Sequence, residues 1–232
     1  MKPILFVLGI FIHLIGVSQP TLRIKEKDRK KDVILVTDSG SIRIHLYEAT
    51  PVHRDNFLSL VKAGFYDGIA FHRIIQEFMI QAGNMETRLD KKLLRRDSAK
   101  YDYTIPAEFR TELFHKRGVL AAARMGDDVN PTKASSGTQF YLVQGRKFSD
   151  KSLDSVENFR LKRKIPIEQR ALYQSLGGAP HLDQSYTVFG EVVEGMEVID
   201  KIASIKTSGR MGGDRPLTDI RIQRAYLVKK KP

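Results

Sequence analysis

Arginine and glutamine side chains that stand among aromatic and apolar residues are the groups in this chain best suited to chemistry. The stretch FHRIIQEFMIQAGN, residues 71–84, contains two apolar runs of strand length, and each run carries one long polar side chain, Arg73 or Gln81. A buried arginine needs a partner for its charge, and an arginine on a wet strand face needs no Phe78 or Met79 beside it. The stretch therefore predicts a half-apolar surface that presents a cation.

A second strand-like run, SSGTQFYLV at residues 135–143, adds to this surface. Its Gln139 and Tyr141 share one face, because side chains alternate along a strand. A surface with one arginine, two glutamines, Phe, Met and Tyr suits a ligand that has an apolar ring and an amide backbone, such as a prolyl peptide. It also suits a reaction that makes and breaks no covalent bond. Ordinary strand-surface residues would explain any one of these side chains, but explain the whole set poorly.

Other catalytic chemistries find little support in the sequence. The chain has no Cys, which excludes disulfides, a thiol nucleophile and thiolate metal sites. It has no GxSxG, P-loop, HExxH or Rossmann motif, and its six His are scattered, so we expect neither a metal nor a cofactor. The stretch VTDSGS (36–41) is similar to the loop of aspartic proteases, whose chemistry needs two carboxylates that share a proton. A second such motif is missing and a homodimer would be required, so a hairpin turn is favoured.

The N-terminal residues, MKPILFVLGIFIHLIGVSQP, have the pattern of a secretory signal peptide. Lys2 precedes an apolar run that ends at Val17, shorter than the roughly 20 residues of a membrane-spanning helix. Gly16 and Ser18 are small residues placed for cleavage. We therefore predict a signal peptide over 1–18 and an exported protein, periplasmic or secreted, without stable membrane insertion. An uncleaved membrane tether is the alternative.

The charge balance is strongly basic, with a formal net charge of +12 over 232 residues. Much of the excess lies in three runs, at 23–31, 162–164 and 229–231. No aromatic residues interleave with these runs, so we interpret them as solvated surface rather than as a nucleic-acid interface.

Alternating apolar and polar residues predict a mainly β domain. Residues 19–31 are expected to be a polar linker, 32–229 one domain, and 145–180 a helical insert within it. Helices are expected at 49–64 and 195–205, the first with Thr50 as N-cap and Pro51 at N1. The runs linked mostly by turns favour antiparallel β structure, either a barrel or a sandwich. The expected strands are 33–37, 42–47, 71–75, 78–82, 118–123, 138–143, 187–193 and 219–228.

Three separated stretches resemble the cyclophilins, the peptidyl-prolyl cis–trans isomerases. FHRIIQEFMIQAGN is similar to the family motif F-H-R-I-I-P-x-F-M-x-Q-G-G-D. SSGTQFYLV and HLDQSYTVFGEVVEGMEVIDKI are similar to two further family motifs, and the resemblance spans about 33–228. It implies a closed eight-stranded antiparallel barrel capped by helices, with the active site on its outer face. It also implies a cofactor-free monomer that isomerises X-Pro bonds, here during the folding of exported proteins, and that binds cyclosporin.

The resemblance assigns Arg73 as the catalytic residue. Gln81 and Gln139 would hold the substrate backbone, and Ala123 and Arg124 would form a strand edge that pairs with the residues before proline. The pocket for the proline ring and its rim would be formed by Phe78, Met79, Tyr141, His181, Leu182 and Tyr186.

Three of these positions depart from the family pattern. Tyr141 replaces a Phe, His181 stands where many members have Trp or Phe, and Tyr186 stands at the usual His. Weak cyclosporin binding follows from His181, because its ring offers less apolar area than an indole. The departures also leave open a second function, a non-catalytic module that binds prolyl segments as a chaperone or scaffold. The retained Arg73 favours the enzyme.

Overall fold

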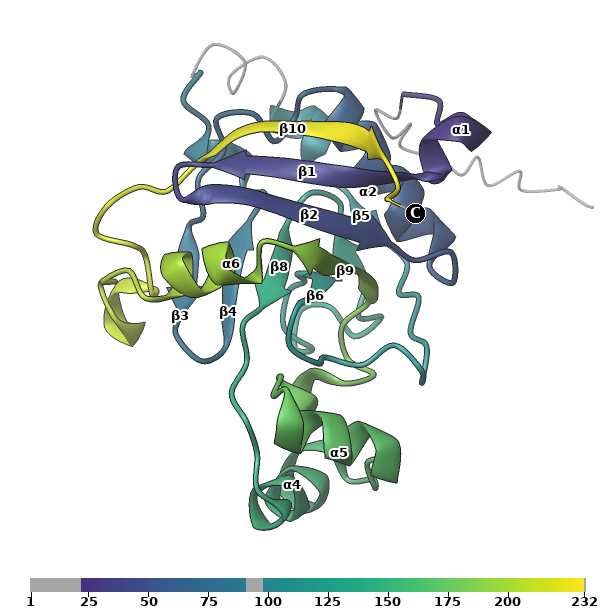
Figure 1. Cartoon of the computed structure of the whole chain (residues 1–232), viewed down its shortest axis with the longest axis vertical. Helices are drawn as coiled ribbons and strands as arrows, with labels where there is room; N and C mark the ends of the chain where they lie inside the picture. Colours follow the sequence, from purple (N-terminus) through teal and green to yellow (C-terminus); the bar gives the residue numbers. More distant parts are fainter. Residues whose placement is uncertain (1–21, 91–97, 232) are drawn as a thin grey trace, which may run out of the picture.

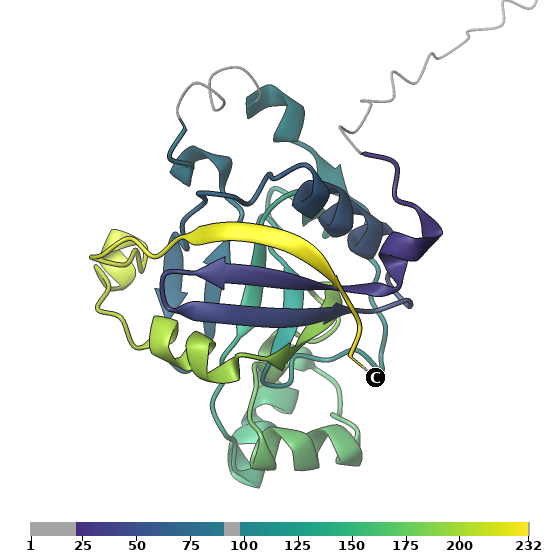
Figure 2. The same ribbon diagram turned by 45° about the horizontal axis from the view of Figure 1, so that its top comes forward.

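A computed structural model describes residues 22–90 and 98–231 of the chain. The predicted signal peptide lies outside the described residues. Eight strands form one antiparallel sheet in the order β10-β1-β2-β9-β6-β8-β4-β3, which curls around a buried core (Figures 1 and 2). These strands are β1 (Lys31–Thr37), β2 (Gly40–Leu46), β3 (Arg73–Ile75), β4 (Met79–Ala82), β6 (Val119–Ala122), β8 (Phe140–Val143), β9 (Val188–Glu194) and β10 (Ile222–Lys229). Each of the eight predicted strands is confirmed, with shorter or shifted ends.

The two edge strands, β3 and β10, are not neighbours in this sheet. The chain just before β3 nevertheless approaches the start of β10, through an isolated bridge between Ala70 and Arg221. Three backbone hydrogen bonds support the approach. Gly68 N–H donates to the Ile222 carbonyl at 2.7 Å, Ile222 N–H to the carbonyl of residue 69 at 2.9 Å, and Phe71 N–H to the carbonyl of residue 220 at 2.8 Å. The sheet is therefore strongly curled, and its two edges approach each other through a few backbone contacts beside the start of β10 rather than through pairing of β3 with β10.

Two helices cover the core of the curled sheet from opposite sides (Figure 2). They are α2 (Pro51–Lys62) and α6 (Met196–Ala203), both close to their predicted positions. Phe57 of α2 and Ile199 of α6 belong to the same buried cluster as Leu35 and Ile44 of the sheet. The ring of Phe57 packs edge-on against Phe140 of β8 at 5.3 Å between centroids. One face of the sheet thus packs on this core, while Met79, Ala121 and Tyr141 on the other face belong to a second, smaller buried cluster.

The predicted polar linker is not separate from the domain in its described part. Residues Glu26–Arg29 form one helical turn, α1. Its Asp28 is buried and pairs with Lys62 of α2 at 2.8 Å, while Arg29 pairs with Asp55 at 2.7 Å. Cations and carboxylates far apart in sequence make this contact, which periodicity cannot reveal.

Short elements that the sequence did not predict connect the main strands. A second, two-stranded sheet pairs β5 (Thr104–Ile105) with β7 (Ser135–Ser136). Residues 84–102 contain two 3-10 turns in their described part, and two further turns follow later in the chain. Within the described ranges, no helix is both long and apolar enough to cross a membrane. The 3-10 turns are η1 (Met85–Thr87), η2 (Ser98–Tyr101), η4 (Pro180–Leu182) and η5 (Arg210–Gly212).

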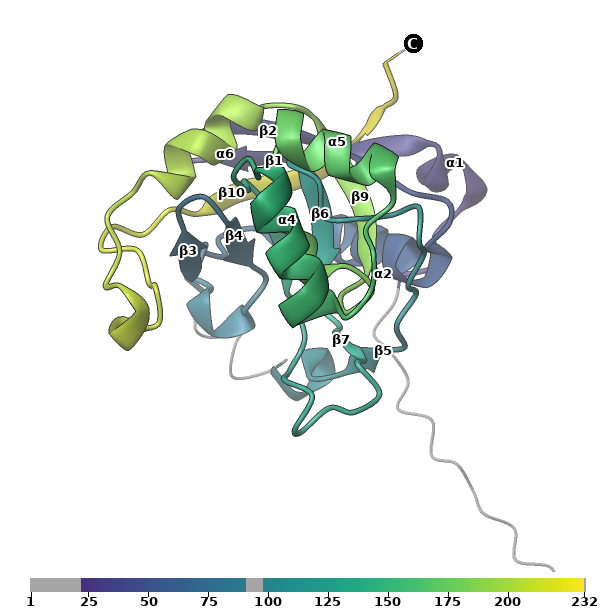
Figure 3. The same cartoon turned by 90° about the horizontal axis from the view of Figure 1, so that it is seen from below.

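The insert is helical, as predicted. It consists of α4 (Asp150–Val156), a π-helical turn η3 (Glu157–Leu161) and α5 (Ile167–Ser175). These helices lie at the lower end of the molecule in Figure 1 and are seen from below in Figure 3. The two ends of the insert meet, because Arg146 forms a bridge with Gly178. Gly178 has a φ of +155°, and a Cβ there would collide with the carbonyl oxygen of His115.

Candidate active site

A cavity of about 220 Å³ opens where β4 and β8 meet the loop that follows the insert. Its walls include Met79 and Tyr141, which belong to a buried cluster separate from the main core. The cavity therefore lies on the outer face of the sheet. Its lining residues are Arg73, Phe78, Met79, Gln81, Ala123, Arg124, Tyr141, Leu182 and Tyr186.

Nine of the eleven residues singled out in the sequence thus surround one cavity. The other two, Gln139 and His181, touch residues of its lining. The side-chain amide of Gln81 donates to Gln139 Oε1 at 3.1 Å, and the ring of His181 lies 5.3 Å from that of Phe78. The structure therefore brings the predicted site residues together, while the roles assigned to them stay predictions.

Strand register explains how residues far apart in sequence meet here. Arg73 of β3 pairs with Gln81 of β4, and Gln81 pairs with Tyr141 of β8. Directly opposed residues of an antiparallel ladder point to the same face of a sheet. The three side chains therefore form a row across the outer face. Ile80, which follows Met79 by one position, points to the core instead.

Arg73 combines exposure with one ionic contact. Its side chain is 42% exposed, and Nε donates to Asp214 Oδ2 at 3.4 Å. The backbone of the same loop also supports β3, because Ile74 N–H donates to the Asp214 carbonyl at 2.9 Å. Asp214 lies in RMGGDRP, which looks like an ordinary turn in the sequence, so no local signal indicated this contact.

Arg124 is held inside the site rather than free on a strand edge. Its Nε donates to the carbonyl of Ser185 at 2.6 Å, and Nη1 pairs with Asp127 at 2.6 Å. The guanidinium also lies over the ring of Tyr186, 4.5 Å from the centroid. Arg124 therefore fixes the loop that carries Tyr186 against β6, and its stem and Ala123 form one wall of the cavity.

Tyr141 carries a hydroxyl at the pocket floor, and this hydroxyl has a buried partner. It lies 2.9 Å from His115 Nε2. Burial raises the pKa of Tyr141 well above its usual value. The sequence did not single out His115, because a lone histidine 26 positions away from Tyr141 carries no motif.

Two further histidines near the cavity are disfavoured as cations. Burial lowers the pKa of His72 to about 4, and the charges of Arg73 and Arg215 lower it further. Burial likewise lowers the pKa of His181, with nearby His115 adding to the effect. Both rings are therefore expected to be neutral near pH 7, so the cations that line the cavity are Arg73 and Arg124.

The stretch VTDSGS (36–41) forms the turn of a β-hairpin. Asp38 lies in the two-residue turn between β1 and β2, where Thr37 pairs with Gly40, and it accepts a hydrogen bond from Arg221 N–H at 2.7 Å. The hairpin interpretation of VTDSGS is confirmed. Across residues 22–90 and 98–231, no group of three or more His, Asp or Glu side chains is arranged to hold a metal ion.

Comparison with known proteins points to one family. The family model described as "Cyclophilin type peptidyl-prolyl cis-trans isomerase/CLD" matches residues 33–227. A putative peptidyl-prolyl cis-trans isomerase of Staphylococcus epidermidis is 30% identical over 208 residues, covering 89% of this chain and 96% of that protein. A putative bifunctional phosphatase/peptidyl-prolyl cis-trans isomerase of Streptococcus pyogenes is 35% identical over 197 residues. The match covers 82% of this chain and 37% of that longer protein.

Solved structures show the same fold. The crystal structure of a Cryptosporidium parvum cyclophilin type peptidyl-prolyl cis-trans isomerase superposes with a TM-score of 0.61 at 19% identity. It covers 87% of this chain and 99% of its own. A second crystal structure of that protein, in the presence of the dipeptide Ala-Pro, superposes with a TM-score of 0.60.

Proposed function

The chain belongs to the cyclophilin-type peptidyl-prolyl cis-trans isomerase family, and from this premise we propose that it accelerates X-Pro isomerisation at the cavity beside Arg73. The observation that carries the proposal is the row of Arg73, Gln81 and Tyr141 along one edge of an apolar pocket. A cation, a backbone-binding amide and a place for a ring are thus held on rigid strands.

The reaction requires a catalyst that favours a twisted amide. Resonance opposes rotation about the C–N bond with a barrier of roughly 18–20 kcal/mol, and X-Pro bonds isomerise unaided in roughly tens to hundreds of seconds. In the twisted state the proline nitrogen regains its lone pair. A guanidinium donor aimed at this nitrogen binds the twisted state and not the planar one, so it lowers the barrier rather than merely tightening binding.

The remaining residues hold the substrate while its bond rotates. Phe78, Met79 and Leu182 offer apolar walls for the proline ring. Gln81 and Gln139 are linked by a hydrogen bond, and we assign both amides to the substrate backbone. The backbone beside Ala123, at the end of β6, is the edge that we assign to the residues that precede proline; within it, the Ala123 N–H already donates to Gln139 and its carbonyl accepts from Ser136. No step of this reaction calls for a metal or a cofactor.

The cellular setting is part of the proposal. The apolar N-terminal run supports export with cleavage after residue 18, to the periplasm or outside the cell, and proline-containing exported chains as substrates during their folding. We also include a closed barrel in the proposal. The bridge between Ala70 and Arg221, with the hydrogen bonds beside it, supports closure between the two edges of the sheet.

A second function, prolyl-segment binding without turnover, is favoured by one observation. Arg124 and Tyr186 are locked together at the rim, which makes the binding loop stiff and the site suited to gripping a segment. An isomerase assay on a short X-Pro peptide separates the two functions. We expect the full chain to accelerate isomerisation, measured by exchange NMR, and the Arg73→Ala variant to do so at least tenfold less. Peptide binding without acceleration by the unmodified chain would establish the binding module instead.

A further inference from the structure

A chain of buried polar contacts links the helical insert to the floor of the proline pocket. Tyr173 of α5 donates its hydroxyl to Asp183 Oδ2 at 2.7 Å. Asp183 Oδ1 lies 2.9 Å from His115 Nδ1, and His115 Nε2 lies 2.9 Å from the Tyr141 hydroxyl. The four residues are at most 4% exposed, so water does not compete for these contacts.

The carboxylate of Asp183 is the acceptor at the centre of these contacts. Asp183 also accepts the backbone N–H of His115 at 2.8 Å. Its carboxylate therefore faces three donors, two from His115 and one from Tyr173. Nδ1 of His115 faces this carboxylate and therefore donates to it, while Nε2 and the Tyr141 hydroxyl share the second contact, in which either group can be the donor. Loss of any one of Tyr173, Asp183, His115 or Tyr141 would therefore leave a polar atom of its neighbour without this hydrogen-bond partner.

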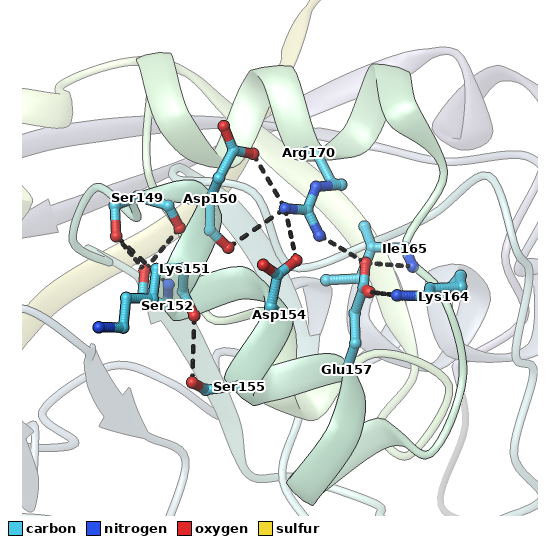
Figure 4. Close-up of polar contacts among 10 residues, drawn as sticks. All are labelled: Ser149, Asp150, Lys151, Ser152, Asp154, Ser155, Glu157, Lys164, Ile165 and Arg170. Atoms are coloured by element: carbon cyan, nitrogen blue, oxygen red, sulfur yellow. Dashed lines mark hydrogen bonds and ion pairs between the residues drawn. The ribbon is translucent and has the colours of Figure 1, made fainter.

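The insert is built to hold Tyr173 firmly. Arg170, one turn before Tyr173 on α5, donates to Asp150 at 2.9 Å, Asp154 at 3.0 Å and Glu157 at 2.7 Å, which fastens α5 to α4 (Figure 4). Glu157 is buried, also pairs with Lys164, and accepts the backbone N–H of Ile165 at 3.0 Å (Figure 4). These cations hold the pKa of Glu157 at about 2 despite its burial, so the junction stays ionised.

Apolar packing joins the same unit to the barrel. Leu153, Ile165 and Tyr173 form a small buried cluster that includes Phe114 and Phe148 at its edge. Phe114 directly precedes His115, and its ring packs edge-on against Tyr173 at 5.5 Å. The insert thus touches the barrel at the residue that reaches the pocket floor.

We propose that the helical insert is a positioning element of the proline pocket, acting through Tyr173, Asp183 and His115 on Tyr141 and Leu182. Asp183 directly follows Leu182, a wall of the cavity, and the far end of the chain of contacts orients Tyr141 at the floor. The proposal rests on the proposed function, because it assigns the insert to the same site. Tyr173, Asp183 and His115 are positioning residues, since none of them lines the cavity.

Removing the Tyr173 hydroxyl should loosen the pocket rather than abolish the reaction. The buried Oδ2 of Asp183 would lose its partner, and an unpaired buried acceptor is costly enough to rotate the side chain or shift its loop. Leu182 and Tyr141 would move with it. Arg73, on the other side of the cavity, keeps its contact with Asp214. The expected effect is therefore a raised KM and a weakened peptide affinity, with a smaller change in kcat.

The test is a double-substitution cycle in the full chain with Tyr173→Phe and Tyr141→Phe. Ser175→Ala is the matched control, because it removes another hydroxyl of α5 that bonds only carbonyls of its own helix. We expect Tyr173→Phe to weaken affinity for an X-Pro peptide by roughly threefold to tenfold, the range of one hydrogen bond. In the Tyr141→Phe background the same change should have at most a twofold effect, because the chain of contacts is already broken. Ser175→Ala should leave affinity unchanged.

Nitrogen-15 NMR of the His115 ring provides a readout that does not depend on turnover. We expect both ring resonances to shift in Tyr173→Phe but not in Ser175→Ala. The proposal would be overturned if the effects of the two Tyr substitutions on peptide affinity were additive. It would also be overturned if the His115 resonances did not shift in Tyr173→Phe. A wild-type chain that binds peptide without accelerating isomerisation would refute the proposed function alone, because the affinity cycle and the NMR arm would still test the insert.

Discussion

Replacing Arg73 by alanine is the most direct perturbation of the proposed reaction. The change removes the only charged group that lines the cavity from β3 and keeps the apolar walls, Phe78, Met79 and Leu182, in place. The proposed contact between the guanidinium and the proline nitrogen exists only in the twisted state. Its loss should therefore lower kcat more than it weakens the binding of the planar peptide.

The size of the effect follows from the surroundings of Arg73. A charge-assisted hydrogen bond contributes about 1.5–3 kcal/mol, which corresponds to roughly a tenfold to hundredfold change in rate. The side chain is 42% exposed, so water competes for it and the lower end of this range is expected. Stability should change by less than about 1 kcal/mol, because the ion pair that is lost, with Asp214, lies near the surface.

Arg73→Lys is the matched control for charge. In the structure Nε of Arg73 faces Asp214, which leaves its two terminal NH₂ groups for the substrate. A lysine has a single ammonium and cannot serve both directions with a planar fork. We therefore expect Arg73→Lys to remain close to Arg73→Ala in kcat/KM, although it preserves the positive charge.

Exchange NMR and titration on one protein sample measure the two required quantities. Exchange NMR gives the rate of isomerisation on bound peptide, and titration gives the ground-state affinity. If Arg73→Ala abolishes affinity while the rate on bound peptide is unchanged, Arg73 is a binding residue and the proposed catalytic role is wrong. A full rescue by Arg73→Lys would refute the argument from the planar fork.

Four further predictions address pH, ligand, insert and export. The pKa of His72 is about 4 in the folded protein and about 6.5 in the unfolded chain. Between these two pH values the unfolded chain binds one more proton than the folded protein. The free energy of unfolding should therefore fall by roughly 1–3 kcal/mol as the pH drops from 6.5 to 4. Denaturant unfolding at several pH values should show this slope in the wild type and lose most of it in His72→Asn. His181→Trp should tighten cyclosporin binding, measured by calorimetry, because an indole adds apolar area and an N–H beside Phe78; equal affinities would contradict this. A variant that lacks residues 150–176 should still unfold cooperatively, because Arg146 and Gly178 lie side by side at the ends of the insert. The same deletion should weaken peptide affinity, because it removes Tyr173 and its hydrogen bond to Asp183. Mass spectrometry of the exported protein should show loss of residues 1–18, and an intact Met1 in a membrane fraction would disprove cleavage.

Local patterns in the sequence determined the elements of the fold. Period-two alternation, as in Ile42 and Ile44, located strands with one buried face, and short apolar runs, as in residues 71–84, located others that are buried on both faces. Pro51 at the first position marked the start of α2. The helical character of the insert was likewise visible in its composition. Strand ends and the two-residue strands β5 and β7 escaped prediction, because a pair of residues carries no period.

The sequence also determined which side chains could form the site. Arg73, Gln81 and Tyr141 were identified by their residue types, which are unusual on ordinary strand surfaces. Their resemblance to a known motif then placed them in one pocket, and the structure shows them around one cavity. What the sequence could not show was how each of them is held.

Only the tertiary structure decided the partners of the site residues. Asp214 lies 141 positions from Arg73, and Asp183 lies 68 positions from His115, so neither pair has a local signature. Such contacts depend on strand register and on how loops return to the sheet. The assignment of Tyr173 to the pocket is the clearest case. In the sequence, a tyrosine inside a polar helical insert looks like a surface residue. In the fold, its hydroxyl donates to a buried carboxylate. The sequence could not show this, because burial depends on how all the elements pack and not on the segment that contributes the side chain.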